Sequence, residues 1–202
     1  MAEKLLLVPW FMGILYGSIP LFWFAIHPFA DRWRKMSKSP YRALLPLWTI
    51  IILALGWAAW PWRSMQVYSQ AWAWALALPF FALGFRTYAS IHSGFGRKLT
   101  GEAELRPDEH EQRLVITGLH ARMRHPIYFA HLCNLAGWTV GSGLWVCFLF
   151  LAISLFLTFP LMIWLEEREL EKRFAQSYRD YKRAVPLIPF PFSPHRYKKV
   201  SA

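Results

Sequence analysis

Four long segments of the chain contain no Lys, Arg, Asp or Glu. They are Leu5–Ala30, Ala43–Trp62, Ser64–Phe85 and His125–Leu165. A helix that crosses a membrane needs about 20 mostly apolar residues, and each of the first three segments reaches that length. The pattern therefore predicts one membrane-spanning helix in each of these three segments.

The fourth segment is too long for one crossing. It runs for 41 residues, from His125 to Leu165, and as a single helix it would be about 60 Å long. Gly141, Ser142 and Gly143 mark a turn near its middle. The segment is thus predicted to form a helical hairpin, which returns Glu166 to the side of the membrane from which the chain enters.

These segments together predict an all-α integral membrane protein with about five transmembrane helices. Residues 1–90 hold helices 1–3, and residues 91–202 hold a cytoplasmic loop, the hairpin of helices 4 and 5, and a tail. The tail begins with helix formers of mixed charge whose apolar residues recur near i, i+4 spacing, which predicts an amphipathic helix over Glu166–Tyr181. The proline-rich VPLIPFPFSP that follows predicts an extended strap.

Composition supports a membrane protein and argues against a soluble domain. Of the 202 residues, 55% are hydrophobic and only 17% are charged, where about 25% is typical of soluble domains. The net charge of +11 raises nucleic-acid binding, but the basic residues lie between the apolar segments. That distribution favours lipid headgroups as the partners of the basic residues, and we predict no nucleic-acid binding.

The distribution of basic residues also predicts the orientation. With the N-terminus outside, 21 of the 23 Lys and Arg residues lie in cytoplasmic segments, as the positive-inside rule requires. The first apolar segment is too long for the core of a signal peptide and is predicted to stay as a span. The C-terminus and the ends of the hairpin are then cytoplasmic.

Two pairs of residues at the ends of the hairpin are candidates for a site. Arg124 and His125 at a membrane boundary have a simple explanation as anchors of a span. Glu166 and Glu167 are harder to explain, because adjacent carboxylates at the inner end of a span oppose the helix dipole and need a cation nearby. From these residues alone, the pairs fit either a functional site or a structural belt of ion pairs, and both interpretations stay open.

Cys133 and Cys147 lie inside the apolar hairpin and are interpreted as buried apolar residues, and no metal site is predicted.

A longer pattern around these pairs is specific to one family. The chain has LVITGLHARMRHPIY, then the apolar hairpin, then EERELEKRFAQSYRDYKRAVPLIP. This arrangement, over about Leu114–Pro189, resembles the C-terminal signature of the isoprenylcysteine carboxyl methyltransferase and phospholipid methyltransferase family. The resemblance implies a membrane enzyme that takes a methyl group from S-adenosylmethionine at the cytoplasmic interface and receives a lipid-like acceptor from within the membrane.

The resemblance also implies the residues of the site. Arg124, His125 and Glu167 are the implied catalytic residues. The implied donor-binding residues are Arg113, Leu114, Val115, His120, His125, Pro126, Ile127, Tyr128, Glu166 and Glu167. In this interpretation a Glu holds the donor's ammonium, Arg124 or His125 binds its carboxylate, and Tyr128 packs against its adenine.

Four positions depart from the family's pattern. The family usually has Tyr at the position of His120 and Gly at that of Ala175. Its carboxyl methyltransferases also have an Arg about one turn before the Glu pair, where this chain has Met162 and Ile163. We therefore treat Met162, Ile163 and Arg168 as the candidate acceptor residues, with Arg168 as a possible substitute for the missing Arg.

An apolar wall at Met162 and Ile163 argues against a carboxylate acceptor. A phospholipid amine or a small apolar nucleophile such as a thiol is then an alternative to an isoprenylcysteine-type carboxylate. Beyond the acceptor and membrane lipids, no partner is predicted, and the oligomeric state stays open.

Two other functions compete with methyl transfer. NADPH-dependent sterol and enone reductases of membranes share the Arg-His-Pro-Xaa-Tyr motif, but they generally have Asn at the position of Ile127 and have more spans. A non-catalytic membrane protein that has kept the fold is the second alternative, because of the departures at His120, Met162 and Ile163.

Overall fold

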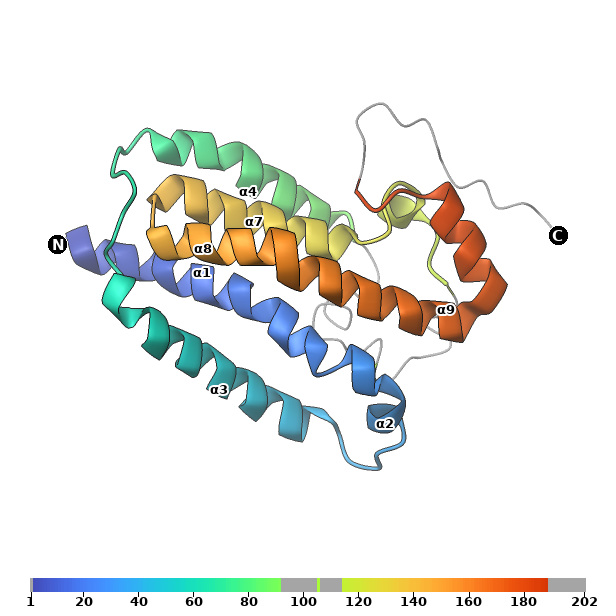
Figure 1. The fold of residues 1–202 in the computed structure, drawn as a ribbon. Helices are drawn as coiled ribbons and strands as arrows, with labels where there is room; N and C mark the ends of the chain where they lie inside the picture. Colours follow the sequence, from blue (N-terminus) through green and yellow to red (C-terminus); the bar gives the residue numbers. More distant parts are fainter. Residues whose placement is uncertain (1, 92–104, 106–113, 189–202) are drawn as a thin grey trace.

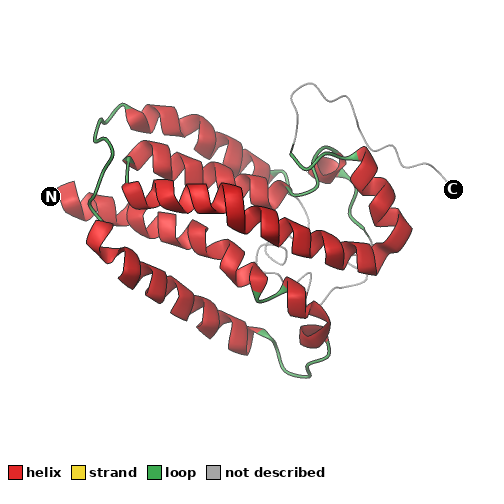
Figure 2. Cartoon of the chain, in the orientation of Figure 1, coloured by secondary structure: helices red, strands yellow, loops and turns green. Residues whose placement is uncertain are grey.

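Helices and the loops that join them form the described fold (Figure 1). The computed structural model describes residues 2–91, 105 and 114–188, and all its named elements are helical (Figure 2). The long helices are α1 (Ala2–Phe24), α3 (Tyr41–Ala59), α4 (Ala73–Ala89), α7 (Pro126–Ser142), and the continuous run of α8 (Trp145–Ile153), the π-helical turn η4 (Ser154–Thr158) and α9 (Phe159–Ala184). The short helices are η1 (His27–Phe29), α2 (Ala30–Arg34), η2 (Trp60–Trp62) and η3 (Gly118–Ala121). The predicted all-α class is confirmed.

Among the described residues, three helical segments are long and apolar enough to cross a membrane. They are Lys4–Arg34, Tyr41–Trp62 and Trp145–Ala184. Large apolar side chains such as Leu53, Trp57 and Phe156 point away from the protein and are 66–83% exposed, as expected of residues that face lipid. Helices α4 and α7 have 17 residues each, which is about 25 Å of helix. Five crossings therefore stay a prediction.

The hairpin turns where the sequence predicted it. Helix α7 ends at Ser142, and Gly143 adopts a left-handed conformation with φ 64°. The Val67 N–H donates to the Gly143 carbonyl at 2.8 Å, and the Trp145 N–H donates to the Met65 carbonyl at 2.9 Å. The turn is therefore held by the segment that leads into α4.

That same segment corrects the third predicted span. A helix was expected from Ser64 onward, but α4 begins only at Ala73. The residues before it are apolar enough for a helix, yet their backbone groups are bonded to the hairpin turn. The Tyr68 hydroxyl also donates to the Val140 carbonyl at 2.6 Å. The prediction was wrong for this segment because a tertiary contact replaces the local helix.

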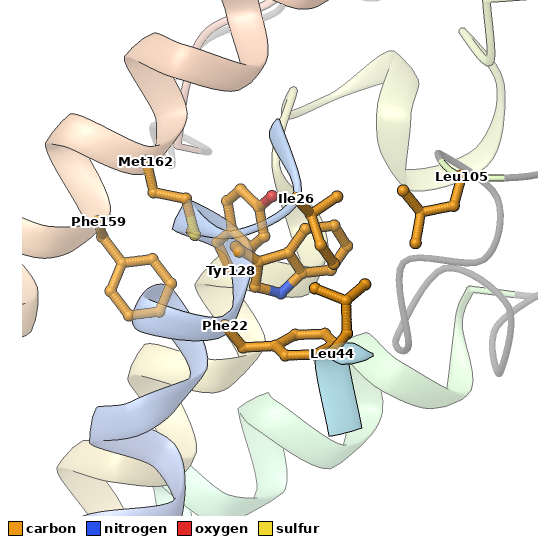
Figure 3. Close-up of a cluster of buried hydrophobic side chains, with 8 residues drawn as sticks. Phe22, Ile26, Leu44, Leu105, Tyr128, Phe159 and Met162 are labelled. Atoms are coloured by element: carbon orange, nitrogen blue, oxygen red, sulfur yellow. The ribbon is translucent and has the colours of Figure 1, made fainter. Parts of the chain in front are cut away.

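A hydrophobic cluster joins the N-terminal helices to the hairpin at the end of the fold where η1 and α2 lie (Figure 3). It contains Phe22, Trp23, Ile26, Leu44, Leu105, Tyr128, Phe159 and Met162. Its members come from α1, α3, α7, α9 and the segments between them. The cluster therefore fixes the starts of α7 and α9 against the end of α1 and the start of α3.

Helix α9 bends at Ala175, and its last part turns away from the line of its first part (Figure 1). Ala175 has φ 48° and ψ −120°, a region that is strained for residues other than Gly. Leu170, Phe174 and Tyr178 pack into one cluster with Tyr181 and Val185, which confirms the predicted amphipathic helix and adds the bend. The predicted strap is non-helical over 185–188, and the rest of it lies outside the described residues.

The hairpin turn gives a test with a matched control. A Cβ at Gly143 would lie 2.2 Å from the Tyr68 carbonyl oxygen, whereas Gly118, with φ 62°, has nothing within 4 Å of an added Cβ. Gly118→Ala should cost about 1 kcal/mol, because only the backbone conformation is penalised. Gly143→Ala should cost roughly 2–4 kcal/mol, because it adds a clash with backbone. Thermal unfolding in detergent measures both, and equal losses would contradict the described turn.

The bend at Ala175 gives a test in which the substitution is expected to stabilise the protein. Ala175→Gly should raise the unfolding temperature, because removing the Cβ relieves about 1–2 kcal/mol of strain. Ser177→Gly, in the regular helix two residues later, should lower it by about 0.5–1 kcal/mol. If the two variants shift the unfolding temperature in the same direction, α9 does not bend at Ala175.

Candidate active site

The predicted convergence of the hairpin ends is confirmed. His125 is the residue before α7, and Glu166 and Glu167 lie on α9. The His125 Nδ1 lies 3.3 Å from Glu166 Oε2, and its Nε2 lies 3.3 Å from Glu167 Oε1. One imidazole therefore bridges both carboxylates of the pair.

Glu167 is surrounded by three cationic groups. Its carboxylate lies 3.1 Å from Arg124 Nε, 3.3 Å from His125 Nε2 and 2.8 Å from Lys182 Nζ. The residue is buried, and a buried carboxylate with this many partners is satisfied by the protein itself. Lys182 was not foreseen, because only the bend at Ala175 brings it back to Glu167.

Glu166 has a different set of partners from Glu167, and this set includes the Tyr128 hydroxyl. Besides His125, its carboxylate faces His27, whose Nε2 lies 3.9 Å from Glu166 Oε2. Within the described residues, Glu166 Oε2 is buried and makes no hydrogen bond of good geometry. Glu166 therefore keeps the capacity to accept a hydrogen bond from a ligand.

His27 is a second member that sequence analysis missed. It lies in η1, is buried, and its Nε2 is 3.3 Å from the Tyr128 hydroxyl. The Trp23 ring stacks on it, with centroids 5.0 Å apart. A histidine inside an apolar N-terminal segment gives no sequence signal of this contact, which only the packing of η1 against α7 creates.

Tyr128 supports His125. The two rings are parallel, with centroids 5.3 Å apart and planes at 6°, and the edge of Phe159 packs on the same tyrosine. Pro126 is the first residue of α7, and Ile127 packs against the hydrophobic cluster. The described contacts of these three residues position His125, and the Tyr128 ring is buried among them instead of presenting an open face for adenine.

The segment before η3 lies under the end of α9. Leu114 packs on the Tyr178 and Tyr181 cluster, and Val115 beside it is half-buried. The Tyr181 hydroxyl donates to the His120 carbonyl at 2.7 Å. Arg113 lies outside the described residues. The structure thus brings Leu114, Val115 and His120 close to the tail.

Arg124 ties the tail to the charged cluster. Besides its contact with Glu167, its guanidinium donates to the Lys182 carbonyl at 3.0 Å, and its backbone N–H donates to the Pro186 carbonyl at 3.0 Å. The start of the strap is therefore fixed beside the candidate site.

The three candidate acceptor residues fall in two places. Met162 is fully buried in the hydrophobic cluster, and Ile163 packs against it. Arg168 is exposed on the other side of α9, where its guanidinium lies 4.6 Å from the centre of the Trp164 ring. The structure does not bring Arg168 together with Met162 and Ile163.

The charge on His125 follows from its surroundings. Burial lowers the pKa of His125, but the carboxylates of Glu166 and Glu167 raise it by more, to about 9. His125 is therefore an imidazolium at neutral pH, with one N–H toward each carboxylate. Such a group holds the pair together and cannot act as a base.

Comparison with known proteins identifies the family. A family model for phospholipid methyltransferases matches residues 72–177, which is more than half of the 202 residues. The chain belongs to the phospholipid methyltransferase family. It is also 32% identical over 104 residues to protein-S-isoprenylcysteine O-methyltransferase B of Arabidopsis thaliana. The match covers 47% of this chain and 48% of that relative, so the chain spans about half the length of the curated relative it matches. No solved structure matches the chain.

The residues that the family model matches include only part of the candidate site. Within the match lie α4, α7, α8 and α9 as far as Gln176 and Ser177, and with them His125, Glu166 and Glu167. His27 and Lys182 fall outside the matched residues. The methyltransferase motif is therefore completed in this protein by one residue from the N-terminal segment and one from the end of α9.

The raised pKa of His125 gives a pH test. Because its pKa is raised in the folded protein, to about 9, its contribution to stability is complete below the unfolded pKa of about 6.5 and is lost as the pH rises through about 9. The wild-type protein should lose on the order of 2 kcal/mol between pH 7 and 9.5 through this group. Thermal unfolding of His125→Gln should show a flatter pH dependence. A variant with the wild-type slope would contradict the assigned charge.

Proposed function

We propose that this protein is an integral-membrane methyltransferase that moves a methyl group from S-adenosylmethionine to a lipid-like or small apolar acceptor. One observation carries the proposal. In a chain of the phospholipid methyltransferase family, His125 and the Glu166 and Glu167 pair meet at 3.3 Å. The named activity of the Arabidopsis relative points to the same class of reaction.

The residues of the site fit the polar groups of this donor. When bound, S-adenosylmethionine supplies a methyl group made electrophilic by its sulfonium. Glu166 Oε2, buried and without a well-formed hydrogen bond in the described part of the chain, is the acceptor we assign to the donor's ammonium. Glu167 already has three cationic partners, so we assign it to holding Arg124, His125 and Lys182 in place.

Two further features fit the rest of the donor. Arg124 and Lys182 supply positive charge next to the Glu166 and Glu167 pair. The carboxylate of S-adenosylmethionine requires such charge. The Tyr178 hydroxyl is buried and has no hydrogen-bond partner among the described residues, and it lies in the cluster that includes Leu114. We therefore place the adenosine side of the donor along Leu114, Val115 and His120, with Arg113 as a further contact.

The chain's own part in catalysis is to position the reactants. Methyl transfer is an in-line displacement that needs the nucleophile and the methyl carbon held about 3–3.5 Å apart in a site without bulk water. The bridge from His125 to two carboxylates and its stacking on Tyr128 make the site rigid before any ligand arrives. No covalent nucleophile is required.

The proposed orientation follows from charge. The loop that contains η1 and α2 and the end of α9 lie at the same end of the bundle as the candidate site (Figure 1). With the basic residues of these segments on the cytoplasmic side, the site is cytoplasmic. Five crossings then place the N-terminus outside and the C-terminus inside.

Two isosteric variants distinguish the roles of the two carboxylates. Glu166→Gln should weaken S-adenosylmethionine binding by about 10- to 100-fold, because it removes a charge-assisted hydrogen bond of about 1.5–3 kcal/mol. Glu167→Gln should mainly lower the unfolding temperature, because three buried cationic groups lose their partner. Calorimetry of donor binding and thermal unfolding in detergent measure the two effects.

Two outcomes would oppose the proposal in different ways. Wild-type protein that does not bind S-adenosylmethionine would overturn the assigned function. Donor binding that survives in Glu166→Gln but is lost in a folded Glu167→Gln would assign the ammonium to Glu167 and leave the methyltransferase itself in place.

A further inference from the structure

A pocket beside the charged cluster is the strongest unexplained feature of the fold. It has a volume of about 460 Å³ and opens between the η1–α2 segment and the first part of α9. The residues that matter for its chemistry are His27, Asp31, Leu165, Arg168, Glu169 and Lys172. Its η1–α2 wall lies outside the residues that the family model matches.

His27 is one of the residues that line this pocket. The ring is 4% exposed, and its Nε2 faces Tyr128 and Glu166 at 3.3 and 3.9 Å. Its Nδ1 is buried and has no hydrogen-bond partner within residues 2–91, 105 and 114–188. A fully buried nitrogen without a partner is unfavourable, so a ligand in the pocket that donates a hydrogen bond to it would be stabilised.

The surroundings of His27 suit a proton acceptor. With its proton on Nε2, toward Tyr128 and Glu166, Nδ1 carries a lone pair. When Nδ1 takes a proton, the nearby Glu166 carboxylate stabilises the imidazolium, which is the usual way a carboxylate supports a catalytic histidine. His125 cannot take this role, because both of its nitrogens already face carboxylates.

Glu169 adds a second unsatisfied acceptor to the same pocket. Its Oε1 accepts a hydrogen bond from Arg34 at 2.6 Å, while its Oε2 is buried and unbonded in the part of the chain that the structure describes. A lone pair on His27 together with a carboxylate oxygen matches a ligand that donates N–H bonds. The lining has three carboxylates, Asp31, Glu169 and Glu171, against the two cations Arg168 and Lys172, so a carboxylate ligand would meet more like charges than opposite ones.

We propose that this pocket holds the acceptor's reacting group, an amine, and that His27 Nδ1 takes the proton that the amine must release before its methylation. The proposal rests on the proposed function. The new bond joins the amine nitrogen to the methyl carbon, and the carbon–sulfur bond of the donor breaks with its electron pair left on sulfur. The headgroup ammonium gives this proton to His27 before the attack, because only the neutral nitrogen has a lone pair, and His27 passes the proton to water. A carboxylate acceptor is already ionised at neutral pH and needs no such base.

Two cations in the lining of the pocket fit the headgroup region of a membrane. Arg168 and Lys172 border the pocket, on the α9 turns that follow the apolar span, and Trp164 beside Arg168 is 51% exposed. An amphipathic aromatic residue and two cations at this level are typical of the interface between lipid tails and headgroups. An amine on a lipid headgroup can therefore reach His27 while its chains stay in the membrane.

The test uses His27→Gln in the full-length protein in detergent. Glutamine keeps a donor toward Tyr128 but removes the base at Nδ1. Methyl transfer to a short-chain phosphatidylethanolamine should fall at least 100-fold in kcat, with S-adenosylmethionine affinity by calorimetry within twofold of wild type. The wild-type rate should fall at low pH as His27 is protonated, and the variant should lack that limb. His131→Gln, a buried histidine on α7 outside the pocket, is the matched control and should keep the wild-type kcat.

A binding measurement tests the pocket without turnover. The same short-chain lipid, added without donor, should bind wild-type protein saturably and bind Leu165→Trp at least tenfold more weakly, because the indole fills the pocket. Wild-type protein that does not bind the lipid, or His27→Gln that transfers methyl groups at the wild-type rate, would overturn this proposal while donor binding still supports the methyltransferase. Transfer only to an S-prenylated cysteine carboxylate or only to a long-chain thiol would overturn it as well. Absence of donor binding by the wild-type protein would overturn both proposals.

Discussion

The arrangement of the site depends on keeping two adjacent carboxylates neutralised at the edge of a membrane. Charges buried away from water cost several kcal/mol each unless they are paired at close range. Consecutive residues on a helix point about 100° apart, so Glu166 and Glu167 cannot share one set of partners. His125 resolves this with one nitrogen toward each, and the start of α7 must therefore lie against the middle of α9.

Because the Glu166 and Glu167 side chains point in different directions, the site has two sides. Glu167 faces Arg124 and Lys182, and through them the end of α9 and the strap. Glu166 faces His27 and the N-terminal segment. A methyltransferase needs a donor and an acceptor on opposite sides of the transferred group. In the proposed function, the acidic pair with its partners on both sides orients both reactants.

The sequence predicted the parts of this arrangement that depend on length and charge. A run of 41 residues without charge, from His125 to Leu165, must fold back on itself, and that alone brought His125 to the Glu pair. It could not predict Lys182, which depends on a backbone conformation at Ala175 that Ala rarely adopts. His27 was missed because a histidine in an apolar segment has no distinctive spacing. The start of α4 was predicted too early, because hydrogen bonds to the hairpin turn replace helical ones and composition does not record such contacts.

The order of the residues along the chain has a consequence for biosynthesis. His27 and His125 enter the membrane region well before Glu166, Glu167 and Lys182 have been made, and without the carboxylates a buried imidazole has reason to stay uncharged. His125 therefore acquires its second ring proton late, after the second helix of the hairpin has been made. Arg124 is held by the carbonyls of Lys182 and Pro186, so this corner of the protein closes only after the ribosome has passed those residues. A chain that ended before Lys182 would therefore carry the His125 and Glu pair without the contacts to Lys182 that hold Glu167 and Arg124 in place.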